Sequence, residues 1–579
     1  MNQHADLIVH NAHVHTVDPR QPRAEAVAVR EGRIVWVGVG GGGGSGRSAR
    51  DADAGGWRDW LGPDTEVVDA GGRLLLPGFV DSHNHVRLGS DSACVQLAGA
   101  GSLPEIGRRI QRWLAETPDA EWVEAEAFDY TAIPAGRMPT AADLDAFTGD
   151  RPAFVLSYDV HTAWLNSAAL RRLGIDASVA QTPYGTVQKD PGTGEPTGFL
   201  TDFAVRGLSR DGHRALEAAG VPWAHPDRQY ARLCGSLDMA ARYGITTVVE
   251  PQNSLDDLAL YERARRAGRL RSRLVAGLFH PRGTSDAELA EFAAAGREHS
   301  GDRFRVGPLK LYIDDVVEPH TAALLEPYAG HHSHRGETFY PPEEFAETFA
   351  RLDRLGFQLF VHATGDRGIR TVLDAAEYAR KVNEGGEGYG GAARGYGGDG
   401  GARHQIVHVE CLDPDDVARF VELDVVACMQ PRHCSPDIAG PGQDWADAVG
   451  PGRWNKAWPM RSLHEAGARL ALSSDWNVAE MDPMVGLYTA VTRQGLAGGP
   501  AWQPEQTLDL ATAVHGYTMG GAYANHLDDR LGSITVGKYA DLVLLSQDLF
   551  ALDDPRAILD TVVDLSVLDG EVVQRSSRV

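Results

Sequence analysis

Two histidines separated by one residue follow an apolar run in the first part of the chain. The run Leu74 to Val80 is followed closely by His83 and His85, with Asn84 between them. Because side chains two residues apart on a strand point to the same face, the two imidazoles could bind one metal ion together. The alternative is a strand end at the surface whose histidines have no special role, and the spacing alone does not decide between the two.

Four further residues that could bind metal or do chemistry lie in, or at the end of, other apolar runs of strand length. They are Lys310, His362, His408 and Asp475. Imidazole nitrogens and carboxylate oxygens are common zinc ligands, and an uncharged lysine in an apolar environment is a nucleophile. Lys310 has a simpler interpretation as a buried lysine that pairs with Asp314 or Asp315. The six candidates form one site only if the fold brings the ends of their runs together.

Eight apolar runs of strand length alternate with helical patterns through the middle of the chain. Examples of the helical patterns are Pro342 to Leu355 and Gly368 to Lys381. This alternation is typical of a parallel sheet covered by helices, and eight such units close a (β/α)8 TIM barrel. The C-terminal ends of its strands meet at one mouth, which would bring the six candidate residues together. The runs are Leu75–Val80, Gly244–Pro251, Ser272–Phe279, Val306–Ile313, Phe357–His362, His404–His408, Val425–Gln430 and Leu470–Asp475.

The two ends of the chain are β-rich and differ from the middle. Glycine punctuation and β-branched residues predict short strands within residues 1–72 and again within 529–579, and we expect both segments to form one small β-sandwich. The barrel should span 73–528, with a large insertion at about 88–243 that follows the first barrel strand and overhangs the active face. The glycine-rich run Gly40 to Arg50 should be a mobile loop, and Gly385 to Gly401 should lie on the opposite face of the barrel.

Charge and cysteine content limit the location and partners of the protein. The 579-residue chain has 55 basic and 80 acidic side chains, and its net charge of −25 argues against binding to nucleic acid or an anionic membrane. Its five cysteines form no CxxC pair, as expected for reduced thiols in a reducing compartment. Neither a secretion signal nor an apolar stretch of membrane-spanning length is visible. We therefore expect a cytoplasmic protein.

Several motifs together resemble the amidohydrolase superfamily, in particular the amidohydrolase-3 or YtcJ-like group that includes N-substituted formamide deformylases. The resemblance covers essentially the whole chain. It weakens after Lys310, where an Asp-Gly pair is usual and this chain has Asp314 and Asp315. The motifs that carry the resemblance are Leu76 to His85, Asp159 to Leu170, Thr197 to Leu200, His362 to Asp366, Ser473 to Trp476 and Gly532 to Leu542.

The resemblance implies a metal-dependent barrel that holds one or two Zn²⁺ ions. Asp475 would bind metal and also move protons, as general base and then general acid. The carbamate formed from Lys310 and CO₂ would turn a costly buried cation into an anionic ligand. The implied ligands are His83 and His85 at the more buried ion, His362 and His408 at the more exposed one, carboxylated Lys310 between the two, and Asp475.

The implied reaction is hydrolysis of a non-peptide C–N bond of a small molecule by metal-activated water. The bond would be an amide, such as an N-formyl or N-acyl group. A cyclic-amide hydrolase or a deaminase could use the same ligands, and a non-catalytic relative could keep the barrel alone, although such a relative should have lost ligands. The expected partners are the small-molecule substrate and a second copy of the chain in a homodimer.

Two segments could contact the substrate. His161, Trp164 and Asn166 lie in the insertion, in a segment whose family counterpart faces the barrel mouth. Equally, His161 and Asn166 could cap the helix that follows them. After the seventh apolar run, Arg432 or His433 could stabilise a developing oxyanion or bind a substrate carboxylate.

Overall fold

The structure is a computed structural model of the single chain, and it describes residues 4–39, 56–89, 94–134, 137–158, 162–179, 186–201, 216–383 and 401–579. The chain forms two compact units. Unit 1 comprises Met1–His85, Leu237–Gln252 and Arg265–Val579, and unit 2 comprises Val86–Ser236 and Asn253–Ala264. The glycine-rich run Gly40 to Arg50 and residues 385–400 of the second such run lie outside the described residues. Within the described ranges, no helix combines the length and the apolar character that crossing a membrane requires.

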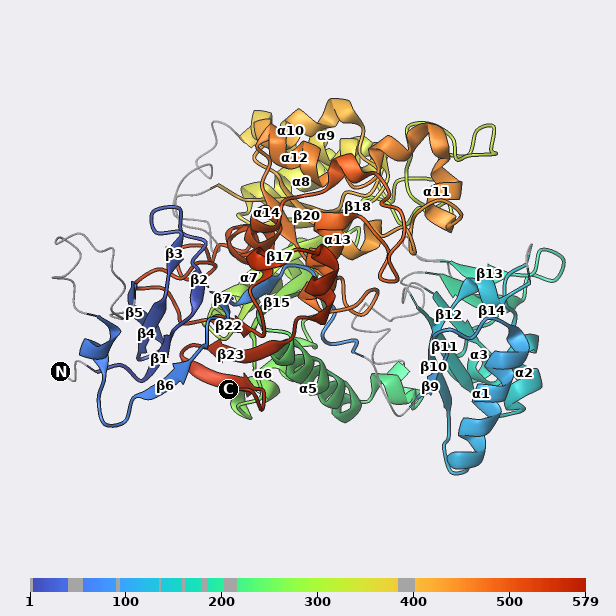
Figure 1. Ribbon diagram of the computed structural model, residues 1–579. Coiled ribbons are helices and arrows are strands. Elements are labelled where there is room, and N and C mark those ends of the chain that lie inside the picture. Colours follow the sequence, from blue (N-terminus) through green and yellow to red (C-terminus); the bar gives the residue numbers. More distant parts are fainter. Residues whose placement is uncertain are drawn as a thin grey trace. The chain divides into compact units, whose positions relative to one another are not determined.

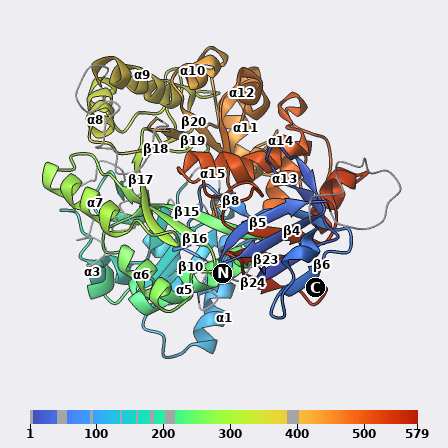
Figure 2. The same ribbon diagram turned by 90° about the vertical axis from the view of Figure 1, so that its left-hand side faces the viewer.

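Eight parallel strands form the barrel (Figures 1 and 2). Their order in the sheet is their order in the sequence, so the predicted (β/α)8 fold is confirmed. The backbone N–H of Asp475, after the last strand, donates to the carbonyl of His83, after the first (2.9 Å), and this bond joins the two ends of the sheet. The strands are β8 (Phe79–Asp81), β15 (Ile245–Asn253), β16 (Arg273–Phe279), β17 (Phe304–Tyr312), β18 (Leu359–Ala363), β19 (Gln405–His408), β20 (Val426–Met429) and β21 (Leu470–Leu472).

Helices follow the barrel strands and lie around the outside of the sheet (Figure 2). Their apolar residues recur every three or four positions, as a helix covered on one face requires. In α8 (Pro342–Arg354), for example, Phe345, Phe349 and Leu352 are buried. The others are α7 (Asp286–Glu298), α9 (Asp366–Asn383), α10 (Val417–Glu422), α11 (Asp444–Val449), α12 (Met460–Ala466), α13 (Pro483–Thr492) and α14 (Leu510–His515). The short α15 (Gly521–Ala524) instead packs with strand residues such as Phe360 and Cys428, and most of α6 (Leu258–Arg266) belongs to unit 2.

The apolar run Leu74 to Val80 is divided between two sheets. Strand β7 (Leu74–Pro77) pairs with two strands of the terminal β-sandwich, whereas β8 pairs with β15 of the barrel. The expected single barrel strand Leu75–Val80 is therefore wrong in its first half, and the sandwich extends past residue 72. Gly78 lies where the chain changes sheets, and a Cβ there would lie 2.2 Å from Thr246 Oγ1. Both halves are buried, so the sequence shows one uninterrupted apolar run.

The two chain ends form a β-sandwich with a shared core (Figure 2). The strand orders of its sheets are β5-β4-β1-β6 and β24-β23-β22-β7-β2-β3. Val9, Leu75 and Leu544 contribute to one buried cluster between the sheets, while Ile8 points to the other face and packs with Trp57. The strands are β1 (Leu7–His10), β2 (His13–His15), β3 (Arg23–Ala24), β4 (Ala26–Arg30), β5 (Arg33–Gly38), β6 (Glu66–Asp69), β7, β22 (Leu542–Leu545), β23 (Val563–Leu568) and β24 (Glu571–Arg575).

Unit 2 has its own sheet and core, and most of it falls within the expected insertion. The strand order is β13-β14-β12-β11-β10-β9, with helices along one side (Figure 1). Ile106, Val123, Val155, Trp164 and Phe199 belong to its buried core. The elements are β9 (Val95–Gln96), α1 (Leu103–Glu116), β10 (Val123–Phe128), α2 (Ala141–Thr148), β11 (Ala153–Ser157), β12 (Thr162–Leu165), α3 (Ser167–Leu173), β13 (Val187–Lys189), β14 (Pro196–Thr201) and α5 (Pro226–Arg242), whose last turns belong to unit 1.

Candidate metal centre

The six predicted metal ligands gather at the C-terminal ends of the barrel strands. The ring centroid of His408 lies 5.1 Å from that of His83 and 4.4 Å from that of His362. Each of the six side chains lies in a barrel strand or within a few residues after one. Their exposed fractions are 1% for His83, 7% for His85, 0% for Lys310, 2% for His362, 5% for His408 and 4% for Asp475.

Three donor atoms form a close triangle. His83 Nε2, His85 Nε2 and Asp475 Oδ1 each lie 3.2 Å from the other two. Around a tetrahedral zinc ion with bonds of about 2.0–2.1 Å, neighbouring ligand atoms lie about 3.3 Å apart. Asp475 Oδ1 is buried and has no hydrogen bond of good geometry among the described residues. The triangle therefore has the spacing and the chemistry of a metal site, because two imidazoles and a carboxylate are a ligand set of catalytic zinc.

Lys310 is a fully buried amine without a hydrogen-bond partner in the described part of the chain. Its Nζ lies 4.7 Å from the ring centroid of Tyr312 and 5.2 Å from that of Phe360. Burial lowers the pKa of Lys310 to about 7, which leaves much of the amine uncharged near neutral pH. The simpler interpretation, an ion pair with Asp314 or Asp315, is wrong; Asp314 instead accepts hydrogen bonds from backbone N–H groups.

His362 and His408 differ in how their nitrogens are engaged. His362 Nε2 lies 3.2 Å from the backbone carbonyl oxygen of Asp315, and its ring stacks on Tyr312. His408 Nδ1 lies 2.9 Å from Gln430 Oε1 and 3.7 Å from Asp475 Oδ2. Besides the close triangle of donor atoms, two further groups of three side chains in the described residues bring their donor atoms close enough to hold a metal ion, and both include His408. They are His83, His408 and Asp475, and His408, Glu410 and His433.

The protonation states of His83 and Asp475 suit metal binding. Burial lowers the pKa of His83 to about 3, so its imidazole is neutral and keeps a lone pair for a metal. Burial disfavours the charged form of Asp475, but the nearby His83, His85 and His408 outweigh it and hold the pKa of this carboxyl well below its usual range. The neutral imidazole and the ionised carboxylate are the forms that coordinate metal ions.

Two buried side chains that were not among the predicted site residues contact the Nδ1 atoms of His85 and His408. Glu250 Oε1 lies 3.3 Å from His85 Nδ1, and Gln430 Oε1 lies 2.9 Å from His408 Nδ1. Such contacts fix the orientation of an imidazole and leave its other nitrogen to the metal. Both lie in or directly after a barrel strand, as the ligands do: Glu250 lies in β15, and Gln430 directly follows β20. That shared position is the signal that could have found them.

The comparison with protein families decides the classification. Residues 66–574 match the model of the Amidohydrolase family. The chain belongs to the amidohydrolase family. Together with the metal-binding groups in the barrel, membership makes it a metal-dependent hydrolase that acts on carbon–nitrogen bonds other than peptide bonds.

Individual relatives cover nearly the whole amidohydrolase chain. It is 28% identical to an N-substituted formamide deformylase of Arthrobacter pascens, over 95% of this chain and 94% of the relative. It is 27% identical to the protein LONG AFTER FAR-RED 3 of Arabidopsis thaliana, over 96% and 91%. Among solved structures, metal-dependent hydrolases of Pyrococcus horikoshii and Pyrococcus furiosus have TM-scores of 0.68 and 0.66, with 20% and 22% identity. Each covers 94% of this chain, and 98% and 99% of the respective structure is matched, so the likeness in fold extends across both units.

Trp164 and Asn166, two of the three expected substrate contacts in the insertion, take structural roles in this amidohydrolase. Trp164 is fully buried in the core of unit 2, and its indole N–H donates to the carbonyl of Thr140 (2.7 Å). Asn166 Oδ1 accepts from the backbone N–H of Ala169 (2.8 Å) and so caps α3. These contacts correct the expectation for Trp164 and Asn166 and support the capping alternative for Asn166. His161 lies outside the described residues.

Of the two expected contacts after β20, only His433 faces the metal centre. Its Nε2 is buried, has no hydrogen-bond partner in the described ranges and lies 3.8 Å from Asp475 Oδ2. The guanidinium of Arg432 instead pairs with Asp437 (2.8 Å) and Glu480 (2.8 Å). Two carboxylates already neutralise this cation, so the expected role of Arg432 in binding an oxyanion is corrected to a structural one.

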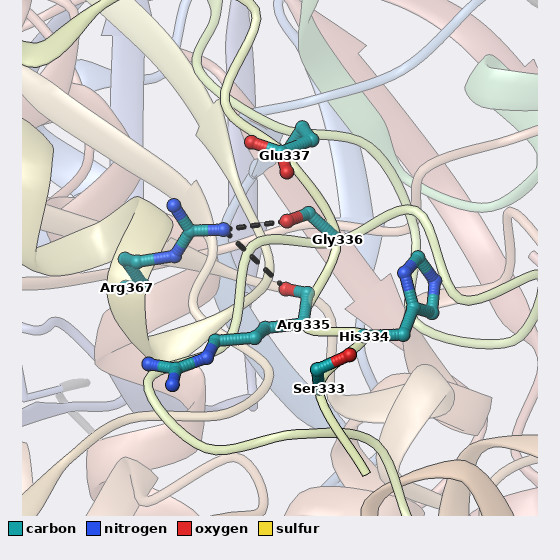
Figure 3. Close-up of a pocket in the computed structure, with 6 residues that line it drawn as sticks. All are labelled: Ser333, His334, Arg335, Gly336, Glu337 and Arg367. Carbon is teal, nitrogen blue, oxygen red and sulfur yellow. Dashed lines mark hydrogen bonds between the residues drawn. The ribbon is translucent and has the colours of Figure 1, made fainter. Parts of the chain in front are cut away.

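A separate open pocket lies on the histidine-rich loop after β17 (Figure 3). It has a volume of about 510 Å³. The Arg367 guanidinium, from the first turn of α9, donates to the backbone carbonyls of Gly336 (2.6 Å) and Arg335 (3.5 Å) and so holds the loop in place. None of the six predicted metal ligands lines it; the lining residues are Ser333, His334, Arg335, Gly336, Glu337 and Arg367.

Proposed function

We propose that the protein is a zinc-dependent hydrolase of N-formyl or N-acyl amides of small molecules, with His83, His85 and Asp475 at the more buried ion. The triangle of donor atoms with 3.2 Å edges carries this proposal, because its spacing is that of ligands around one tetrahedral ion. The formamide deformylase relative, 28% identical over 95% of the chain, supports an N-formyl amide as the substrate class.

The two oxygens of Asp475 can take different roles, one as a metal ligand and the other in proton transfer. Oδ1 lies in the triangle, whereas Oδ2 faces His408 Nδ1 (3.7 Å) and His433 Nε2 (3.8 Å). A bound divalent ion supplies Lewis acidity, which lowers the pKa of a water molecule and polarises the amide carbonyl. The ionised Asp475 then takes the proton of the attacking water and returns it to the leaving nitrogen, as general base and general acid.

Carboxylation of Lys310 is part of the proposal. The amine nitrogen forms a bond to the carbon of CO₂ and releases one proton, which yields an anionic carbamate. The buried position and the pKa of about 7 support this step, since the uncharged amine is the reactive form. In that form Lys310 would supply oxygen ligands between the ion of His83 and His85 and an ion at His362 and His408.

We also propose that the protein resides in the cytoplasm. All five cysteines are free and buried, which supports a reducing compartment such as the cytoplasm. The homodimer stays a prediction.

The experiment is a hydrolysis screen with N-formyl, N-acyl and cyclic amides, on the parent protein and on Asp475→Asn. We expect N-formyl amides to be cleaved and the variant to lose about two to four orders of magnitude in kcat. Glu480→Gln is the control, because it removes a half-exposed carboxylate that pairs with Arg432 and is not one of the predicted ligands. Parent rates in Asp475→Asn would refute the proposed chemistry, and cleavage of cyclic amides alone would transfer the proposal to a cyclic-amide hydrolase.

A further inference from the structure

Three histidine rings gather on the loop that follows β17, and none of them is a predicted ligand of the metal centre in the barrel. The ring centroid of His331 lies 5.0 Å from that of His320 and 5.6 Å from that of His334. The centroids of His320 and His334 lie 6.3 Å apart. His320 is half-buried, and the other two side chains are exposed. The loop therefore concentrates three potential metal ligands at one place.

The separations within this histidine cluster are close to those of imidazoles around one ion. At zinc–nitrogen distances of about 2.0–2.1 Å, ring centroids lie about 3.2 Å from a tetrahedral ion and about 5.2 Å from one another. In the barrel, the centroid of His83 lies 5.0 Å from that of His85 and 5.1 Å from that of His408. The two pairs that include His331 have similar separations, and the third pair has about 1 Å to close.

Tyr328 forms the buried base of the histidine cluster. It is 1% exposed, and its hydroxyl donates to the carbonyl of Ala322 (2.7 Å). Its ring stacks on His320 (4.6 Å between centroids) and on His334 (5.5 Å). Its backbone N–H donates to the carbonyl of His334 (2.9 Å), and its carbonyl accepts from the N–H of His331 (3.0 Å). Backbone contacts as well as stacking therefore keep the three histidines together.

The hydrogen bonding and charge of the cluster favour neutral imidazoles. His334 Nε2 lies 2.9 Å from the carbonyl oxygen of His320, which can only accept. In the neutral ring, Nε2 therefore carries the hydrogen and Nδ1 keeps the lone pair. Metal-binding histidines commonly make such a bond with their second nitrogen. Burial, and then the nearby His331 and His334, lower the pKa of His320, which favours its neutral form.

Binding requires the rings of the cluster to turn. Unlike the groups that include His408, they do not yet aim one nitrogen each at a common point. His331 and His334 are exposed, and exposed side chains change rotamers within nanoseconds, so both rings can turn toward an ion. His320, stacked on the buried Tyr328, is the ligand that stays in place.

We propose that His320, His331 and His334 form a surface site for a divalent transition metal ion such as Zn²⁺. Imidazole ligands suit Zn²⁺, Ni²⁺ and Cu²⁺, whereas Ca²⁺ and Mg²⁺ prefer oxygen ligands. A bound ion links His320 to the two histidines further along the loop and so stabilises the loop against local opening. The site does not depend on the proposed function, because it shares no residue with the six predicted ligands in the barrel.

The test is chemical footprinting of the untagged, zinc-loaded protein with diethyl pyrocarbonate, which modifies imidazoles that bind no metal, followed by peptide mass spectrometry. With added Zn²⁺ at about ten times the dissociation constant, modification of His331 and His334 should fall about tenfold. His332, an exposed neighbour in the same loop that is not part of the cluster, should react as before. Added Mg²⁺ should protect none of the three. Equal protection of all three histidines, or protection of none, would overturn the site.

Calorimetric titration with Zn²⁺ supplies a second measurement. The parent should bind one ion beyond those of the barrel, and His331→Asn and His334→Asn should each lose this ion or bind it about tenfold or more weakly. His332→Asn is the matched control and should bind as the parent does. His85→Asn, which removes a barrel ligand only, should keep the loop ion, so a failure of the barrel centre can be told from a failure of this site. Parent-like binding in both cluster variants, or an equal loss in His332→Asn, would refute the proposal.

Discussion

The closeness of His83, His85 and Asp475 results from backbone contacts between the first and last strands of the barrel. The N–H of Asp475 donates to the carbonyl of His83 (2.9 Å), and the N–H of His85 donates to the carbonyl of Trp476 (2.5 Å). Asp475 has φ = 58°, a left-handed conformation that is uncommon for a residue other than glycine. The closure of the sheet thus positions the ligand triangle.

His280, a buried histidine that is not one of the predicted ligands, predicts a pH dependence of stability. Burial lowers the pKa of His280 from 6.5 to about 4, and both of its ring nitrogens lack hydrogen-bond partners among the described residues. Between these pH values the unfolded chain binds more protons at this residue than the folded protein does, so the free energy of unfolding falls as the pH falls. The full difference is on the order of 3 kcal/mol.

Urea unfolding at several pH values between about 7 and about 5 checks this prediction. His280→Gln should flatten the decline in stability, whereas His332→Gln, at an exposed histidine, should leave the decline as it is in the parent. A decline of the same size in His280→Gln would show that other groups cause it.

At the scale of elements, the sequence predicts the barrel strands, but it places the first half of the run Leu75–Val80 in the wrong sheet. All eight apolar runs correspond to barrel strands, because a strand covered by helices on the outside needs apolar residues on both faces. Leu74 to Pro77 belong instead to the sandwich, where they are buried as well. Burial in either sheet selects the same residue types, and only the close approach of Gly78 to Thr246 marks the change.

The candidate site also contains residues that the sequence could assign and residues that it could not. His83, His362, His408 and Asp475 could be found because polar residues at the ends of apolar runs are conspicuous. Asn166 could not be assigned, because asparagine serves equally as a helix cap and as a substrate contact. Glu410 and His433 follow two different strands, whose end residues His408 and Gln430 are 22 positions apart in the sequence. Only the fold therefore brings Glu410 and His433 close to each other.

Asn166→Ala should destabilise unit 2 without a direct effect on catalysis. The side chain is fully buried and bonds to backbone N–H groups of Ala153 (2.9 Å) and Ala169 (2.8 Å). Its removal leaves both donors unsatisfied, at a cost of about 2–4 kcal/mol in the free energy of unfolding. Thermal unfolding checks the stability and substrate titration checks KM. A large rise in KM with unchanged stability would restore the substrate-binding interpretation.

At the scale of the molecule, a buried ion pair joins the barrel to the sandwich. Arg273, the first residue of β16, binds both carboxylate oxygens of Asp541, which precedes β22 (2.7 and 2.9 Å). The side chains are 2% and 3% exposed. The sequence did not predict this pair, because 268 positions separate the two residues. Strand patterns reveal the two sheets, but not which polar residues meet between them.

Arg273→Met should lower the free energy of unfolding by about 3–5 kcal/mol, because it leaves Asp541 buried without its partner. Asp569, which also pairs with Arg273, loses a contact as well. The double variant Arg273→Met/Asp541→Leu should recover part of the loss, since it removes the uncompensated charge. Thermal unfolding of the parent, Arg273→Met, Asp541→Leu and the double variant checks this prediction. A double variant less stable than the sum of both single changes would contradict it.

The central claim is that hydrolysis depends on a metal ion held at His83, His85 and Asp475. Chelation followed by metal analysis and assay with an N-formyl amine tests it most directly. We expect the purified protein to contain zinc, the chelated protein to lose both metal and activity, and added Zn²⁺ to restore both. His85→Asn should not recover either. A preparation that hydrolyses the substrate at full rate without any transition metal would contradict the account.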